Sequence, residues 1–421
     1  MTDNPDLSRL EAMSAGRYGW RDTWCRVVVR FRSLDVLAAL TAASLPWSTT
    51  APAVFIVLWL IVLVPTIDWS EFVRDLSHPA CILPLALFGL AIIGVLWSDD
   101  TWSAGMHGVK PVAKLLLIPF LQYHFQRSSR GSWVFIAFMG SCTLLLMLSW
   151  VVLFFPEFKI APTVSAGVPV KNYIDQSQEF TLCVFALAPP AFMSFRERRW
   201  ASAIGYLGLL AFVANMFFVV SARAALVYIP VLLAVFAARH LERNAMLALF
   251  AATAVAVTLV WSTSPYLRKR VADLATEYHG YESNIVASTA ERLEFWRKSI
   301  KIFAEAPIFG HGTGSTRRLF ERDAVGQTGL GALVTSNPHN QTLNVAVQWG
   351  LIGVVTLYGM WLSHLMLFQG EGLAAWIGLV VVVQNLVSSL FNSHLFDFHE
   401  GWLYVLGVGI AGGISLSKKN A

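Results

Sequence analysis

The residues best suited to chemistry are one histidine and two arginines that lie far apart in the chain. His339 follows Asn337 and Pro338, which are favoured at the N-cap and first position of a helix, and an apolar run from 340 to 368 follows. We therefore expect His339 in a first helical turn, where free backbone N–H groups disfavour an imidazolium and attract an anion. A neutral imidazole there could act as a general base. The simpler alternative is a histidine that caps a membrane helix at the water interface.

Arg223 is predicted to lie just inside an apolar helix over 222–239, at the end that we place outside the membrane. A cation at this end is unfavourable unless an anion neutralises it, although an arginine can also extend to lipid headgroups. Arg292 is predicted in the first turn of a second, amphipathic helix. It could lean toward the bundle or remain a solvated or lipid-facing charge.

Together these residues suit one reaction. Two guanidinium groups can bind a pyrophosphate in a bidentate manner, and a neutral imidazole can take the proton of an attacking hydroxyl. Arg223 and Arg292 would stabilise the charge on a leaving diphosphate, which elsewhere is often the role of Mg²⁺, while His339 would be the base. The combination suits transfer from a lipid diphosphate.

A second polar cluster lies between the last two apolar runs. His394, Asp397, His399 and Glu400 could bind a metal or position an acceptor sugar. An acceptor-side or structural role is favoured, because 392–400 matches no recognised metal-ligand pattern. We predict neither a metal nor a cofactor.

Three further features have a functional and a simpler interpretation. Asp99 and Asp100 could hold a divalent metal or act as a base, but paired acids at a helix end more often reflect topology. Lys159, Lys171 and Asp175 could form a substrate rim. The glycine run 310–314 could cradle a phosphate, but without a preceding strand or a Walker lysine a mobile turn is favoured.

Composition shows what must position these groups. The chain has 421 residues, of which 56% are hydrophobic and only 14% charged, with a mean hydropathy of +0.58. Soluble proteins carry about 25% charged residues, so we expect an all-α polytopic membrane protein. About twelve transmembrane helices are predicted, at 34–48, 52–68, 80–97, 110–122, 132–155, 180–195, 200–220, 222–239, 245–261, 340–368, 372–391 and 400–416. The four cysteines, at 25, 81, 142 and 183, form no CxxC motif.

Charge placement predicts the orientation. The first 32 residues lack the features of a cleavable signal, and arginines and lysines gather in the connections expected to be cytoplasmic: Arg127, Arg130, Arg196, Arg198, Arg199, Arg239, Arg243, Lys418 and Lys419. The net charge of +5 therefore gives no indication of nucleic-acid binding. We expect a cytoplasmic segment 1–33, helices over 34–261, a periplasmic helical loop 262–339, helices over 340–416 and a cytoplasmic tail 417–421.

The long polar segment contains one predicted helix. A capping box at Ser288 opens it and Glu305 ends it, and Leu293, Trp296, Ile300 and Phe303 form one apolar stripe. We expect this stripe to lie on the membrane or on the bundle. Arg297, Lys298 and Lys301 are expected to contact lipid headgroups.

The chain resembles the O-antigen ligase and polymerase superfamily in three blocks. They are Ser221-Ala222-Arg223-Ala224-Ala225-Leu226; Glu291-Arg292-Leu293-Glu294-Phe295-Trp296 with Ala306-Pro307-Ile308-Phe309-Gly310-His311-Gly312; and Asn337-Pro338-His339-Asn340 with Gly350-Leu351-Ile352-Gly353. The resemblance covers about residues 215 to 360. It implies a glycosyltransferase of GT-C-like fold in the inner membrane of a Gram-negative bacterium, with its active site facing the periplasm.

The resemblance also implies substrates and roles. In the ligases, the donor is O-antigen on undecaprenyl diphosphate and the acceptor is a sugar hydroxyl of lipid A-core. By motif, His339 resembles the base of a metal-independent inverting transfer, and Arg223 and Arg292 resemble the diphosphate-binding pair. Ligase is preferred over O-antigen polymerase, which commonly has two large periplasmic loops, and over protein O-oligosaccharyltransferase, which usually extends beyond the last helix. A lipid-linked glycan transporter or flippase is the alternative of another class, but its ionisable residues would be expected near the bilayer midplane.

Overall fold

The computed structural model describes residues 32–196, 201–219, 222–266, 268–269, 271–273 and 288–419. Within these residues helices are the only regular secondary structure, so the all-α prediction is confirmed. Most of the predicted cytoplasmic segment 1–33, with Cys25, and also Arg198 and Arg199 lie outside the described residues.

The predicted apolar runs all fall on helices. They correspond to residues 32–44, α2 (Thr50–Leu63), α4 (Pro79–Ile93), α5 (Trp102–Ala113) with α6 (Leu117–Arg127), α7 (Gly131–Phe154), α8 (Tyr173–Arg196), α9 (Ala201–Phe218), α10 (Ala225–His240), α11 (Arg243–Thr263), α15 (Gln341–Leu367), α16 (Leu373–Ser388) and α17 (Phe398–Lys419). The amphipathic helix of the polar segment is α13 (Ser288–Glu305), with the predicted bounds. Two short helices, α3 (Trp69–Leu76) and α14 (Thr316–Ala324), were not predicted.

The predicted count of about twelve membrane spans is not confirmed. Four helical stretches in the described residues are long and apolar enough to cross a membrane: Pro79–Trp97, Gly131–Phe154, Arg243–Thr263 and Gln341–Leu367. A fifth is reached if α2 and α3, which meet at 114°, count as one broken span. Helices such as α10 and α16 are apolar but shorter than a bilayer core requires. These spans make the chain an integral membrane protein.

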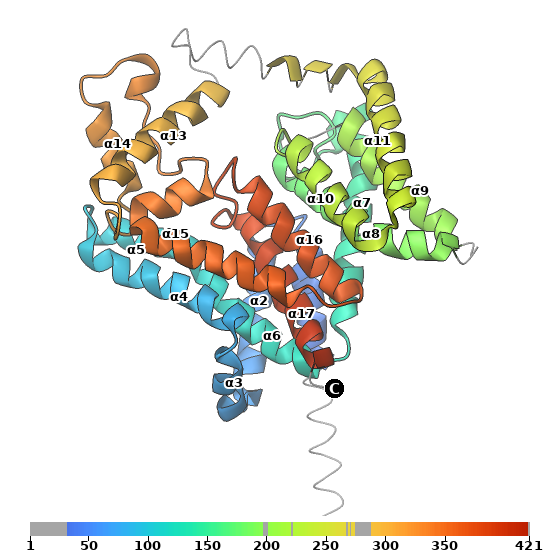
Figure 1. The fold of residues 1–421 in the computed structure, drawn as a ribbon, viewed down its shortest axis with the longest axis horizontal. Helices are drawn as coiled ribbons and strands as arrows, with labels where there is room; N and C mark the ends of the chain where they lie inside the picture. Colours follow the sequence, from blue (N-terminus) through green and yellow to red (C-terminus); the bar gives the residue numbers. More distant parts are fainter. Residues whose placement is uncertain are drawn as a thin grey trace, which may run out of the picture.

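The helices pack into a bundle around a core rich in aromatic side chains (Figure 1). α17 packs along α6 and α16, α4 runs beside α15, and α8 pairs with α9. Trp59, Trp349, Trp361 and Trp376 are fully buried in this core. By contrast α11 buries none of its residues, so its apolar surface is left for lipid.

A second, smaller core holds the polar segment onto the bundle. Phe295 and Ile302 of α13, Leu319 and Phe320 of α14, and Val347 of α15 are buried together. In Figure 1 α13 and α14 lie beside the first half of α15. This contact places the start of α13 near the residues that precede α15.

The glycine run 310–314 is a packed junction, so the prediction of a mobile turn is wrong. Its backbone N–H groups all donate to protein acceptors, at 2.8–3.0 Å: the carbonyls of Ala306, Val347, Gln348 and Gly94 and the side-chain oxygen of Gln348. Gly310, Gly312 and Gly314 have positive φ, and an added Cβ at each would lie within 2.6 Å of backbone atoms of other segments. The same hydrogen bonds exclude the phosphate cradle, because no N–H group of the run is left for an anion.

The junction fits a break in α15. Gly350 has φ +60° and ψ −154°, which interrupts the helix. The backbone N–H groups of Leu351 and Ile352 donate to the carbonyls of Pro307 and Ile308, at 2.8 and 3.4 Å. Two of the blocks that carry the resemblance are therefore in direct backbone contact.

Candidate active site

His339 lies before the helix and not in its first turn, which corrects the sequence prediction. α15 begins at Gln341, and the side chain of Asn340, not of Asn337, caps it by accepting from the N–H of Leu343 at 3.1 Å. Asn337 instead accepts from the N–H of His339 at 2.9 Å, a local turn that competes with helix formation. His339 has φ +54°, and it is the one non-glycine residue with positive φ in the described part of the chain. Such backbone strain is concentrated at functional sites.

The His339 ring is half-buried between α13 and the segment before α17. It stacks on Phe295, with ring centroids 6.0 Å apart and an interplanar angle of 22°. Its Nδ1 lies 2.8 Å from Oδ1 of Asn392, and the indole of Trp296 donates to its carbonyl at 3.4 Å. Burial lowers the pKa of His339; the Asn392 hydrogen bond opposes this and the charge of Arg292 adds to it. This shift favours the neutral ring, which a base requires.

Arg223 lies in the turn before α10, because this helix begins at Ala225 and not at residue 222. Its guanidinium donates to the hydroxyl of Thr289 at 3.4 Å. Thr289 is in the first turn of α13, three residues before Arg292, whose charge acts on His339. The structure thus gathers Arg223, Arg292 and His339 at the start of α13.

The buried face of α13 is not its apolar stripe. Ala290, Glu294, Phe295, Lys298, Ser299 and Ile302 are buried. Ile300, in the predicted stripe, is 58% exposed, and Leu293, Trp296 and Phe303 are only partly buried. The stripe therefore faces away from the small core, and Arg292 lies on the border between the two faces.

The expected headgroup contact of Lys298 is wrong. Its side chain is 0% exposed, and its ammonium donates to the carbonyls of Gly331 and Leu333 instead of to lipid. Asp323 lies 3.8 Å away. Burial lowers the pKa of Lys298, and Asp323 opposes the shift. Arg297 and Lys301 remain largely exposed.

Three residues of the predicted second cluster meet. Nδ1 of His394 lies 3.3 Å from Asp397 and 3.4 Å from Glu400, and His394 and Glu400 are buried. Burial alone would lower the pKa of His394, but the two carboxylates raise it overall. The imidazole and the two carboxyl groups thus form one compact polar cluster. Its ligand atoms lie within 4.8 Å of one another, so it could also hold a metal ion, the alternative that the sequence pattern left less favoured.

His399 belongs to a different set of contacts. Its Nε2 lies 2.9 Å from Glu179, and the Lys171 ammonium donates to its Nδ1 at 3.1 Å. Lys171 also donates to the carbonyl of Leu45, and Asp175 is buried. The expected rim of Lys171 and Asp175 is thus largely interior, and Lys159 holds its own loop by donating to the carbonyls of Thr163 and Ser165.

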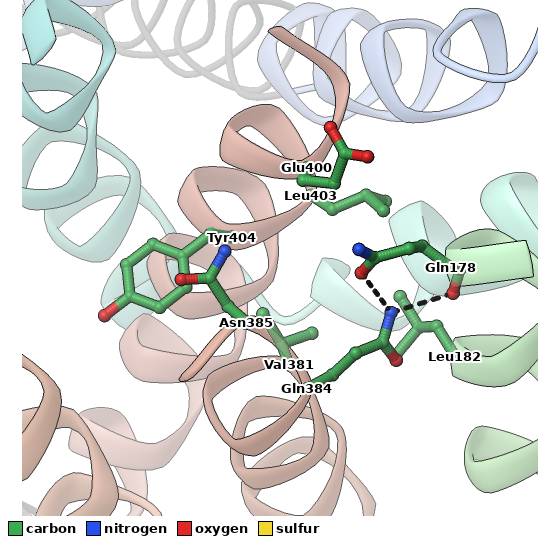
Figure 2. A pocket seen from close by; sticks show the side chains of 8 residues that line it. All are labelled: Gln178, Leu182, Val381, Gln384, Asn385, Glu400, Leu403 and Tyr404. Carbon is green, nitrogen blue, oxygen red and sulfur yellow. Dashed lines mark hydrogen bonds between the residues drawn. The ribbon is translucent and has the colours of Figure 1, made fainter. Parts of the chain in front are cut away.

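A small polar pocket adjoins the second cluster (Figure 2). Gln178, Leu182, Val381, Gln384, Asn385, Glu400, Leu403 and Tyr404 line it. The Gln384 amide donates to both the side-chain and backbone oxygens of Gln178, at 2.9 Å each. Because Glu400 also contacts His394, the polar interior between α8, α16 and α17 is continuous with that cluster.

Asp99 has a structural partner. Its carboxylate lies 2.7 Å from Nδ1 of His311, whose Nε2 faces the carbonyl of Ile302 at 3.0 Å. Asp100 accepts from the N–H of Thr101 at 2.6 Å. The structural interpretation of this acidic pair is favoured, because Asp99 joins the end of α4 to the glycine run.

Asn392 is the residue of this site that sequence reasoning missed. It lies 53 residues after His339 and contacts its ring. A polar residue just before His394 gave no distinguishing signal, because an asparagine in a turn is ordinary.

Residues 208–358 match the family model described as O-antigen ligase. No curated protein matches the chain. The matched segment begins in α9 and ends in α15, so it contains Arg223, Arg292 and His339. This match supports the resemblance of the chain to the O-antigen ligase and polymerase superfamily.

Proposed function

We propose that this protein is an O-antigen ligase. It transfers O-antigen polysaccharide from undecaprenyl diphosphate to a sugar hydroxyl of lipid A-core, at the periplasmic face of the inner membrane. The observation that carries the proposal is that the Arg292 charge acts on the half-buried His339 and that Arg223 contacts the first turn of the same helix as Arg292, all within the segment that matches the family. The segment 262–339 is the periplasmic loop of this proposal, and the GT-C-like architecture stays a prediction.

Each group has one role in the reaction. The acceptor oxygen attacks the anomeric carbon, and its proton passes to Nε2 of His339. The bond from that carbon to the diphosphate oxygen breaks, and the diphosphate leaves with the electron pair. Arg223 and Arg292 stabilise the growing negative charge. Attack from the face opposite the leaving group inverts the anomeric centre, and the transfer requires no metal.

The second cluster is proposed to lie on the acceptor side. Asp397 is partly exposed and joins the buried His394 to the surroundings of His339 through Asn392. A sugar hydroxyl that approaches His339 would meet these polar groups. His399, which faces Glu179 and Lys171, has a structural role in this proposal.

The test is transfer by purified protein in detergent, with a lipid-diphosphate-linked glycan, lipid A-core and EDTA. Wild type is expected to form core-linked product, and His339→Ala is expected to fold but to lose about 10²–10⁴-fold in rate. His107→Ala is the matched control, because His107 is exposed on α5. Arg223→Ala and Arg292→Ala are expected to weaken donor use, whereas Arg317→Ala, at a 69% exposed side chain, should not.

Other outcomes would replace the proposal. Longer lipid-linked chains would indicate a polymerase, and transfer to a protein would indicate an oligosaccharyltransferase. Loss of activity in EDTA would indicate a metal-dependent reaction, with His394, Asp397 and Glu400 as the candidate ligands. An active His339→Ala variant would contradict the assignment of His339 as the base. If no product of any kind forms, the transporter alternative is favoured.

A further inference from the structure

A continuous chain of side-chain hydrogen bonds runs from the glycine run to Asp397. The N–H of Gly314 donates to Gln348 Oε1 at 2.8 Å, and the Gln348 amide donates to Asn344 Oδ1 at 2.5 Å. Asn344 then donates to the hydroxyl of Ser393 at 2.9 Å. The chain thus crosses from α15 to the segment before α17.

The remaining links lead past His339. The Ser393 hydroxyl donates to Asn337 Oδ1 at 2.7 Å, and the Asn337 amide donates to Asn392 Oδ1 at 3.0 Å. The Asn392 amide donates to Asp397 Oδ2 at 2.6 Å. Each member accepts from one neighbour and donates to the next, so every donor in the chain points toward Asp397.

The two ends fix this direction. A backbone N–H such as that of Gly314 can only donate, and a carboxylate such as that of Asp397 can only accept. The orientation of a single amide is ambiguous, because its oxygen and nitrogen are exchangeable in shape. Reversing any amide in this chain would place two oxygens or two N–H groups face to face. The orientation of Asn392 is therefore set by both ends of the chain.

This orientation decides which nitrogen of His339 carries the proton. Asn392 presents its oxygen, and not its N–H, to Nδ1 of His339 at 2.8 Å. A neutral ring can donate there only if its proton is on Nδ1, which leaves the lone pair on Nε2. We propose that Asn392, oriented by the chain from Gly314 to Asp397, is a positioning residue that holds His339 as the Nδ1–H tautomer with Nε2 free to act as the base.

The proposal rests on the proposed role of His339 as the base. The charged groups around His339 explain why an amide, and not a carboxylate, contacts its ring. The charged groups that act on His339 are Arg292 and Glu291 of α13 and Asp397 beyond Asn392. Asn392 separates the ring from Asp397, so the ring is oriented by a neutral acceptor. A carboxylate in direct contact would favour the imidazolium, which could not take a proton.

The first test reads the tautomer without any reaction. The protein is labelled with ¹⁵N-histidine and studied in lipid bilayers by solid-state NMR, with the His339 signal assigned by its loss in His339→Gln. A neutral Nδ1–H ring is expected in wild type, and an Nε2–H ring would overturn the proposal. Gln348→Glu replaces a donor of the chain with a group that only accepts, so it is expected to change the His339 tautomer signal. Gln327→Glu, at an exposed position, is its control; an unchanged signal in Gln348→Glu would overturn the directional chain.

The second test uses transfer. Asn392→Leu removes the acceptor and is expected to lower kcat at least ~10-fold while the donor KM stays within about twofold. Asn392→Asp keeps an acceptor and is expected to retain more activity than Asn392→Leu, with the acid limb of its pH profile moved to higher pH. Asn244→Leu, at an exposed position in the first turn of α11, is the control. Wild-type kcat in Asn392→Leu would overturn the proposal.

The two failures are distinguishable. If wild type transfers no glycan, the proposed function fails, and the NMR tautomer still decides the arrangement of Asn392 and His339. If wild type is active and His339 carries its proton on Nε2, only the positioning role fails. Size-exclusion profiles in detergent establish that each variant is folded before either result is read.

Discussion

Leu351 donates its backbone N–H to the carbonyl of Pro307 at 2.8 Å, a bond that replaces a helical one where α15 breaks at Gly350. The break in α15 and the segment that contains the glycine run therefore pack together through backbone hydrogen bonds. Through Gln348 and Gly314 the same junction also begins the hydrogen-bond chain that ends beside His339. The glycine run 310–314 thus contributes to the geometry of the site around His339, although it is distant from that residue in sequence.

Gly350→Ala is expected to destabilise the protein. The residue has φ +60°, and an added Cβ would lie 2.3 Å from the carbonyl oxygen of Ile308. Backbone strain alone costs about 1–3 kcal/mol, and the clash adds to it. Gly359→Ala is the matched control on the same helix, because its Cβ would meet only Leu83 at 3.8 Å, and it should be neutral or stabilising by up to about 1 kcal/mol. Thermal unfolding in detergent, followed by tryptophan fluorescence, compares them; equal midpoints would contradict the argument.

Hydropathy predicted the helices well because every predicted run is long and apolar. The bounds of α13 followed from a capping box at Ser288 and a proline after Glu305, which are local signals. The number of membrane spans could not be predicted from hydropathy in the same way. α16, for example, is apolar and mostly buried by the bundle, and a buried helix and a spanning helix have the same composition.

The contacts of the site could be predicted only in part. Charge types identified His339, Arg223 and Arg292, because a cation at a helix start requires an explanation. The orientation of α13 was not predictable from its stripe, since Lys298 is buried by backbone carbonyls that no periodicity reveals. Asn392 was missed because its importance arises from a contact across 53 residues.

The proposed topology predicts which surfaces are accessible from the periplasm. Val325, 79% exposed after α14, should react with an impermeant maleimide in intact cells when replaced by cysteine. Asn244→Cys, exposed in the first turn of α11, should react only after the inner membrane is opened. Background from Cys81, Cys142 and Cys183 is low because all three are buried, and Cys25 is replaced in both variants. The reverse labelling pattern would place the loop in the cytoplasm and exclude a periplasmic active site.

Arg292 should set the pH dependence of transfer as well as donor binding. Burial and the positive charge of Arg292 both lower the pKa of His339 below its usual 6.5. A base acts when unprotonated, so the acid limb of kcat/KM for wild type is expected below this value. Arg292→Gln removes the charge, the pKa of His339 rises, and the acid limb moves to higher pH.

The shape of the profile separates this effect from weaker donor binding, because a change in donor affinity alone lowers the profile without moving its limb. Arg297→Gln is the matched control: Arg297 is on the same helix, is 55% exposed and pairs with Glu294 at 2.6 Å. Exposed charges are screened by salt, so the profiles are measured at low ionic strength, where the contribution of Arg292 is largest. A limb that stays in place in Arg292→Gln would mean that the Arg292 charge does not act on the base. The guanidinium would then serve the diphosphate alone, and burial would be what keeps His339 neutral.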